Sequence, residues 1–232
     1  MIESFYVCTM FCGEPDMPHC LKSLQEQGVE FTHKVISFKD ELTAHNEVYQ
    51  AFNDAPPGTI KLKLDADVVL YPGALKYVSK ILDGKDNWWF TPNVHDFFTW
   101  GPLQAGITFF CDKAKFRVQT NALKCDRGVT IGCGHVTNQR PIAKHAHFCN
   151  ERTAFHYGFH RGLKGQTAVM EKVRSAQEIS PDPRREFAIK GFQAAHKFDW
   201  SNEEAYTKHG QFPSFHSYGD LVFEELFRDA VK

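Results

Sequence analysis

The heptapeptide KLKLDAD at residues 61–67 constrains the fold of this chain more than any other stretch. Its first four residues alternate between lysine and leucine, which is the period of a β-strand. Asp65 and Asp67 follow directly, where such a strand leaves its sheet. Two carboxylates this close repel each other unless a divalent cation, itself able to hold phosphate oxygens, lies between them. The stretch therefore predicts a strand that ends at a cation-binding edge, although the same acids could simply cap the following turn.

The first third of the chain predicts strands and helices in alternation. β-Branched and aromatic residues indicate three strands, at residues 3–9, 31–38 and 60–64. Apolar residues at helical spacing indicate three helices, at residues 18–27, 40–52 and 74–82. This order is typical of an α/β domain whose central, mostly parallel sheet has helices on both faces. Because ligands bind beyond the carboxyl ends of such strands, Thr9, Asp40 and the two acids are expected at one crevice.

The remainder of the sequence is less regular. Strands are expected at residues 88–90, 106–111 and 142–148, and the last of them presents His145 and His147 on one face. Loops are expected at residues 93–102, which are rich in aromatic side chains, and at residues 128–139. A helix is expected to start near Asp112, and others at residues 152–163, 168–177, 183–198 and 221–231.

Composition limits the class of protein. The seven cysteines are odd in number and lack the paired spacing of a zinc ribbon, which favours a reduced, intracellular chain. No apolar run approaches the ~20 residues that span a bilayer, and the N-terminus lacks the pattern of a secretion signal. A soluble cytoplasmic protein without a membrane span is therefore expected.

The charge is unevenly distributed along a chain whose formal net charge is −1. Residues 113–190 hold 15 basic and 6 acidic residues, a local excess of 15 − 6 = 9 positive charges. Such a region is either a solvated helical surface or a face that meets phosphates, of a nucleotide donor or of a nucleic acid. Both interpretations stay open at this point.

The acidic motif Asp65-Ala66-Asp67 resembles the DXD motif of nucleotide-sugar-dependent glycosyltransferases of the GT-A fold. The resemblance covers the layout of roughly the first 165 residues, from the N-terminal strand to the strand that carries the histidines. It implies a single GT-A-like (Rossmann-like) domain over residues 1–165 that binds the nucleotide sugar and carries the catalytic site. Residues 166–232 are then a helical C-terminal extension packed on the same domain.

The resemblance also implies a metal site. In that family the acids bind Mn²⁺ or Mg²⁺, which holds the diphosphate of the donor and stabilises the charge that develops on it. Asp67 is the expected direct ligand, and Asp65 contacts the ribose or a metal-bound water. A later histidine commonly completes the site, here His147 or, next in order, His145. His156 and His160, four residues apart on an expected helix, form a rival metal pair.

Other residues are assigned to the donor and to catalysis with the same resemblance in mind. Arg152, Arg161 and Lys164 follow the histidine strand, and their cationic side chains suit a diphosphate. Thr9 and Asp40 are candidates for the nucleotide base and ribose by position. A carboxylate that deprotonates the acceptor hydroxyl is required only in inverting enzymes, and Asp96 and Asp126 are the candidates.

The implied activity is transfer of a sugar from a nucleoside-diphosphate sugar, a UDP-sugar first of all, to an acceptor hydroxyl. The acceptor is a glycan or, second in order, a modified base in DNA that the basic region and the aromatic loop could hold. The alternatives are a nucleotide- or nucleic-acid-binding module without transferase activity and a nucleotidyltransferase. Residues 10–18 disfavour the last, because they contain one glycine and neither lysine nor arginine.

Overall fold

A six-stranded mixed sheet forms the centre of the molecule in the computed structural model, which describes residues 4–85, 87–120, 125, 133–136, 140–197 and 222–224. The strands in sheet order are β2 (Glu30–Ser37), β1 (Ser4–Phe11), β3 (Thr59–Asp65), β8 (Ile107–Phe110), β5 (Trp88–Phe90) and β9 (Gly134–Val136). β1 pairs in parallel with β2 and β3, whereas β8 is antiparallel to both β3 and β5. With β9 parallel to β5, β8 alone among these strands runs against the others, which confirms the expected mostly parallel sheet.

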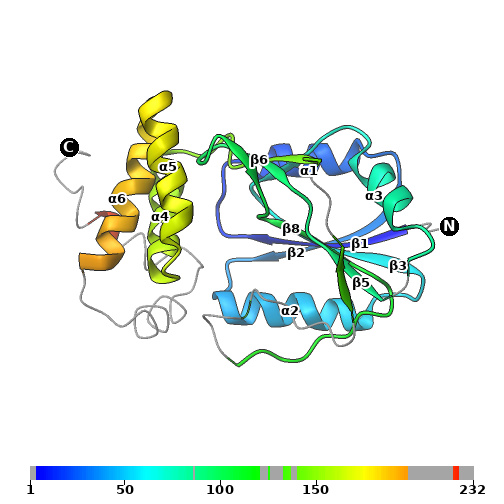
Figure 1. The fold of residues 1–232 in the computed structure, drawn as a ribbon. Helices are drawn as coiled ribbons and strands as arrows, with labels where there is room; N and C mark the ends of the chain where they lie inside the picture. The colour runs from blue at the N-terminus through cyan, green and yellow to red at the C-terminus, as the bar shows by residue number, and fades with distance from the viewer. Residues whose placement is uncertain are drawn as a thin grey trace.

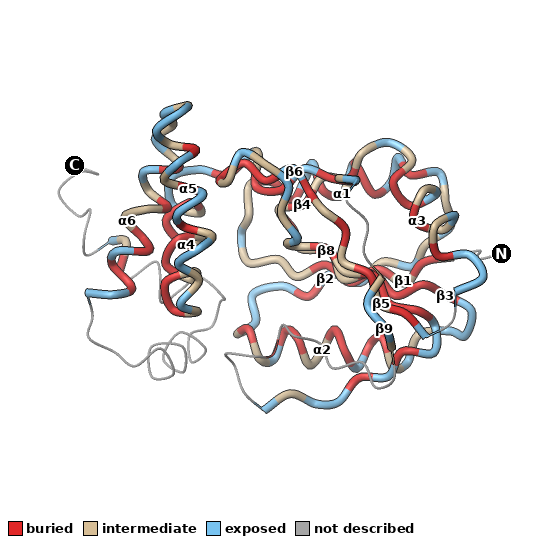
Figure 2. Tube along the Cα trace, in the orientation of Figure 1, coloured by how far each residue is buried: buried red, intermediate tan, exposed pale blue. Residues whose placement is uncertain are grey.

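Three helices cover the two faces of this sheet, as the alternation predicted. α1 (Met17–Gln25) and α3 (Ala74–Leu82) lie on one face and α2 (Glu41–Asp54) lies on the other (Figure 1). Asp40 caps α2, since its side chain accepts a hydrogen bond of 2.9 Å from the backbone N–H of Thr43. Figure 2 shows buried residues along β1, β3 and β8 and on the inward sides of the helices. On these three strands, Val7, Leu62 and Phe109 are fully buried.

A second, four-stranded sheet was not expected from the sequence. Its order is β4 (Val68–Leu70), β10 (Ala143–His145), β6 (Val94–Asp96) and β7 (Gly101–Leu103). It replaces the expected loop at residues 93–102 with two strands of three residues each, too short to show a period in the sequence. β10 pairs in parallel with β6, which sets His145 beside Asp96, and antiparallel with β4, which begins just after Asp67.

Three further helices lie beyond the carboxyl ends of β1 and β3: α4 (Glu151–Leu163), α5 (Thr167–Ile179) and α6 (Pro183–Lys197) (Figure 1). Their own apolar core includes Phe98, Met170, Val173 and Phe192. α4 packs so closely on α6 that glycines are required at the crossing. A Cβ atom on Gly158 would lie 1.7 Å from the carbonyl oxygen of Ala188.

Two expectations about the middle of the chain are wrong. The loop expected at residues 128–139 includes β9, and no helix starts near Asp112. Residues 112–120 instead run beside α2, held by paired hydrogen bonds between side chains of the helix and the backbone of the segment. Of the final helix expected at residues 221–231, only residues 222–224 are described, and they are helical. None of the described helices is both long and apolar enough to cross a bilayer.

Lys61 is buried despite its charge and its place in an alternating strand, and only 1% of the residue is exposed. Its Nζ donates hydrogen bonds to the backbone carbonyls of Asp112 (2.8 Å) and Ala114 (2.6 Å). The lysine therefore ties β3 to the segment that follows β8.

Replacing Lys61 with methionine, which keeps the apolar stem, is expected to lower the free energy of unfolding by about 1–3 kcal/mol, because two carbonyls lose their donor. Urea denaturation measures the change, and the exposed Lys80→Met on α3 is the matched control. Equal stability of the two variants would contradict a structural role for the Lys61 ammonium group.

Candidate functional site

A cavity of about 380 Å³ opens at the carboxyl ends of β1 and β3, between these strands and α4. Its wall carries acidic side chains from the sheet side and basic side chains from α4; among them are Asp16, Asp65, Asp67, His145, Arg161 and Lys164. The volume lies in the range of small-molecule sites, which are about 300–1,000 Å³. The cavity therefore lies at the edge of the sheet where residues 61–67 predicted a cation-binding site.

Asp65 is the last residue of β3 and is anchored through its backbone. Its N–H donates a hydrogen bond of 2.7 Å to the carbonyl of Gly106, and its Oδ1 lies 2.6 Å from Nζ of Lys63. Gly106 has a φ of +68°, and a Cβ atom there would lie 2.6 Å from Val68 Cγ2 and 3.2 Å from His145 Cδ2. Only glycine fits at this point, where the two sheets meet beside the acids.

His145 bridges two carboxylates and is almost completely buried. Its Nε2 lies 3.2 Å from Oδ2 of Asp67, and its Nδ1 lies 2.6 Å from Oδ1 of Asp96. Only an imidazolium donates from both ring nitrogens. Burial alone would lower the pKa of His145, but the carboxylates of Asp67 and Asp96 outweigh burial and hold this pKa well above its usual value. Asp67, His145 and Asp96 thus form a row in which one imidazolium lies between two carboxylates.

The same row keeps both acids ionised. Burial acts to raise the pKa of Asp67 and of Asp96, but the His145 imidazolium overcomes it, so both carboxyl pKa values are lowered. Asp96 also accepts a hydrogen bond of 2.7 Å from the backbone of Thr99. Asp96 does not contribute to the described cavity wall, because it lies on the side of the imidazole away from Asp67. In this geometry Asp96 orients the His145 ring and stabilises its protonated form.

Two buried carboxylate oxygens in the cavity wall have no hydrogen-bond partner within the part of the chain that the structure describes. They are Oδ1 of Asp67 and Oδ2 of Asp16. The other oxygen of Asp16 accepts a hydrogen bond of 2.8 Å from the backbone N–H of Phe148. Oxygen atoms of this kind are the ligands that Mg²⁺ and Mn²⁺ prefer, so the residues present fit a divalent cation.

Asp16 should make the stability of the metal-free protein depend on pH. Burial, together with the nearby Asp67 charge, raises the pKa of Asp16 to about 7, although the hydrogen bond from Phe148 acts in the opposite direction. The folded state therefore holds a proton that the unfolded state loses near pH 4, and stability falls as the pH rises from about 4 to about 7.

Asp16→Asn, a neutral mimic that can still accept from Phe148, is expected to remove this fall. In EDTA, the variant should gain stability over the wild type between pH 4.5 and pH 8 by about 3 kcal/mol. Urea denaturation at the two pH values measures the gain, and the exposed Asp54→Asn serves as the control. A difference between variant and wild type that does not change with pH would contradict a proton on Asp16.

On the helical wall, α4 is tied to α2 by one buried acid. Glu41, 2% exposed, lies 3.2 Å from Nε2 of His160 through Oε2 and 3.3 Å from Nζ of Lys164 through Oε1. Arg161 stacks its guanidinium over the ring of Tyr157, 4.8 Å from the centroid, and donates to Oε1 of Gln166. Lys164, just after α4, is thus paired with Glu41, and it lines the same cavity as Arg161 and the acids of the sheet side.

The structure brings together one part of the predicted set, namely Asp65, Asp67, His145, Arg161 and Lys164, with Asp96 behind His145. The rival pair His156 and His160 also lines the cavity. Asp126 lies outside the described residues. Asp16 and Glu41 were missed, because each is an ordinary acid at the start of a helix and only burial distinguishes it.

Four other predicted residues lie away from the described cavity wall: Thr9, Asp40, Arg152 and His147. β1 continues to Phe11, so Thr9 is inside the strand, and its Oγ1 contacts His33 at 2.9 Å. Asp40 caps α2, and Arg152 is exposed on α4.

The expectation that His145 and His147 share a strand face is wrong. β10 ends at His145, and Ala146 adopts a left-handed φ of 56°, which breaks the alternation. His147 therefore turns away from His145, and its Nε2 lies 3.2 Å from the carbonyl oxygen of His95.

No family model matches the sequence, and no curated protein matches it. Among solved structures, the chain is similar to the mannosyltransferase PcManGT from Pyrobaculum calidifontis, which was solved in complex with GDP-Man and Mn²⁺. The identity is 12%, the TM-score is 0.42, and the match covers 96% of this chain and 82% of the other. At this level the likeness does not assign an activity to this chain.

Proposed function

We propose that this chain is a metal-dependent glycosyltransferase that moves a sugar from a nucleoside-diphosphate sugar to an acceptor hydroxyl. The observation that carries the proposal is the arrangement of charge around the cavity. On the sheet side, Oδ1 of Asp67 is buried and has no hydrogen-bond partner among the described residues, and on the helical side Arg161 of α4 and Lys164, just after it, line the cavity. A diphosphate with its cation is a ligand that matches both sides.

Within this proposal, Asp67 holds the Mn²⁺ or Mg²⁺, and Asp65 contacts the ribose or a water on the metal. The cation, when bound, stabilises the negative charge that grows on the leaving diphosphate. His145 holds Asp67 in place and is itself charged and oriented by Asp96. Arg161 and Lys164 bind the phosphate oxygens, for which Lys164 must exchange its present partner Glu41 for the donor.

The substrates follow from the same proposal. The donor is a UDP-sugar in the first instance, and the acceptor is a glycan or, second in order, a modified base in DNA. Residues 1–165 carry the donor and catalytic site, and residues 166–232 form the helical extension packed on the same domain. Asp96 is buried behind His145, so a catalytic base of the inverting type is better sought elsewhere, and Asp126 stays a candidate.

A screen of nucleotide sugars tests the proposal. Release of UDP or GDP is measured with each sugar donor, with Mn²⁺ or Mg²⁺ and with EDTA, first alone and then with glycan or DNA acceptors. Metal-dependent release from at least one donor is the expected result. Salt-sensitive binding to DNA or RNA without turnover of any donor would instead favour a nucleic-acid-binding module.

A further inference from the structure

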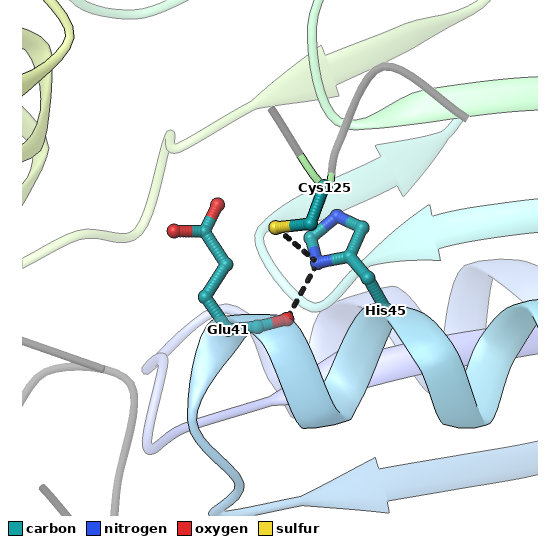
Figure 3. Close-up of side chains that lie close together, drawn as sticks. All are labelled: Glu41, His45 and Cys125. Carbon is teal, nitrogen blue, oxygen red and sulfur yellow. Dashed lines mark hydrogen bonds between the residues drawn. The ribbon is translucent and has the colours of Figure 1, made fainter. Parts of the chain in front are cut away.

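We propose that Glu41, His45 and Cys125 form a second metal site, which takes a zinc-like divalent cation. One possible ligand atom of each residue lies within 4.8 Å of those of the other two, and all three residues are buried. Figure 3 shows Glu41 and His45 on the first turns of α2, with Cys125 beside the imidazole. A thiolate and an imidazole select Zn²⁺ over the Mn²⁺ or Mg²⁺ that an oxygen site such as Asp67 would take.

α2 supplies two of the ligands from adjacent turns. Glu41 and His45 are four residues apart, so their side chains lie on the same face of the helix. Nδ1 of His45 lies 2.9 Å from the carbonyl oxygen of Glu41, a contact drawn in Figure 3. Nδ1 is also the ring nitrogen that Sγ of Cys125 contacts, so the metal binds His45 through Nδ1 in the tautomer that carries its proton on Nε2, and the contact with the carbonyl is lost on binding.

Cys125 reaches His45 because α2 holds the incoming segment at several points. Asn53 exchanges two hydrogen bonds with the backbone of Phe116, and Asn46 exchanges two with the backbone of Gln119. Tyr49 then donates from its hydroxyl to the carbonyl of Cys125 at 2.7 Å. Sγ of Cys125 consequently lies 3.7 Å from Nδ1 of His45, so the fold itself sets the cysteine beside the imidazole.

The spacing and charge of the three residues suit a tetrahedral ion. Zinc–ligand distances of about 2.0–2.3 Å imply ligand atoms roughly 3.3–3.8 Å apart, which side-chain rotation can reach from the present positions. On binding, the thiol of Cys125 releases its proton to solvent and the sulfur bonds to the metal. The thiolate and the Glu41 carboxylate then offset the two positive charges of the cation. His160, with Nε2 3.2 Å from Oε2 of Glu41, is a candidate for the fourth ligand.

The natural rival for a soft metal is the other close pair of sulfur atoms. Sγ of Cys111 and Sγ of Cys133 are 3.8 Å apart, on the far part of the sheet at the ends of β8 and β9. Among the described residues, that pair has no histidine or carboxylate close enough to make a group of three ligands, whereas Cys125 has both. A test must therefore separate the two cysteine sites.

Cobalt spectroscopy makes this separation. Co²⁺ added to the full chain should bind and give the thiolate-to-cobalt charge-transfer band in the near ultraviolet, which an oxygen site cannot give. Cys125→Ser should lose the band and His45→Gln should weaken it. Cys133→Ser and Asp67→Asn should keep it, because neither residue belongs to the proposed site.

A second measurement covers the case in which a variant folds poorly. In the wild-type protein, Zn²⁺ should slow alkylation of Cys125 by at least about 10-fold, read peptide by peptide by mass spectrometry, because a metal-bound thiolate is protected. The alkylation of Cys133 should be unaffected. Absence of a thiolate band in the wild type, or a band that survives Cys125→Ser and disappears in Cys133→Ser, would overturn the proposal.

Discussion

Asp67→Asn is expected to reduce metal-dependent turnover of the nucleotide sugar by about 100-fold or more. Asparagine has nearly the same shape and can still accept the hydrogen bond from Nε2 of His145. It lacks the negative charge that the buried Oδ1 offers to a cation. The metal therefore binds less tightly, and the negative charge on the leaving diphosphate is stabilised less.

The exposed Asp83→Asn, at the C-terminal end of α3 and outside the described cavity wall, is the matched control for this prediction. Binding of Mn²⁺, followed by electron paramagnetic resonance, should weaken in parallel with activity in the Asp67 variant and stay unchanged in the control. Wild-type turnover in Asp67→Asn would remove the residue from the metal site. Lost turnover with intact Mn²⁺ binding would move the metal to another set of residues.

Gly158→Ala and Gly191→Ala are expected to cause the largest losses of stability. A Cβ atom on Gly191 would lie 2.1 Å from the carbonyl oxygen of Phe155, and one on Gly158 would lie 1.7 Å from that of Ala188. Backbone atoms cannot move aside as side chains do, so α4 and α6 must separate. We expect each variant to lose about 3 kcal/mol or more, although alanine by itself favours a helix by about 1 kcal/mol.

Gly101→Ala on β7 is the control for both, since its Cβ would lie 3.8 Å from the nearest atom, an ordinary contact. Urea denaturation measures the three variants side by side. α4 carries Arg161 and Lys164, so the two destabilised variants should also lose affinity for a nucleoside diphosphate. Variants as stable as the wild type would show that the two helices pack less closely than the structure indicates.

Sequence patterns predicted the elements well wherever a period was long enough to be seen. The strands β1, β2 and β3 and the helices α1 to α6 all lie near the predicted ranges, because alternation and helical spacing are local properties of consecutive residues. The position of Asp65 and Asp67 at the end of β3 followed from the same local pattern. The strands β4, β6, β7 and β9, of three residues each, were not predicted, because they contain too little pattern to be recognised. β5 and β10 are as short but lie within predicted strands, at residues 88–90 and 142–148.

The sequence by itself thus determined the sheet with helices on both faces and the edge at which its acids lie. Tertiary structure alone decided which side chains meet there. His145 lies between Asp67 and Asp96 because β10 pairs with β6 and β4, and Cys125 lies beside His45 because α2 holds a segment from 80 residues away. Such contacts depend on strand register and on turns such as the one at Ala146, and these are properties of the assembled chain that no local pattern encodes.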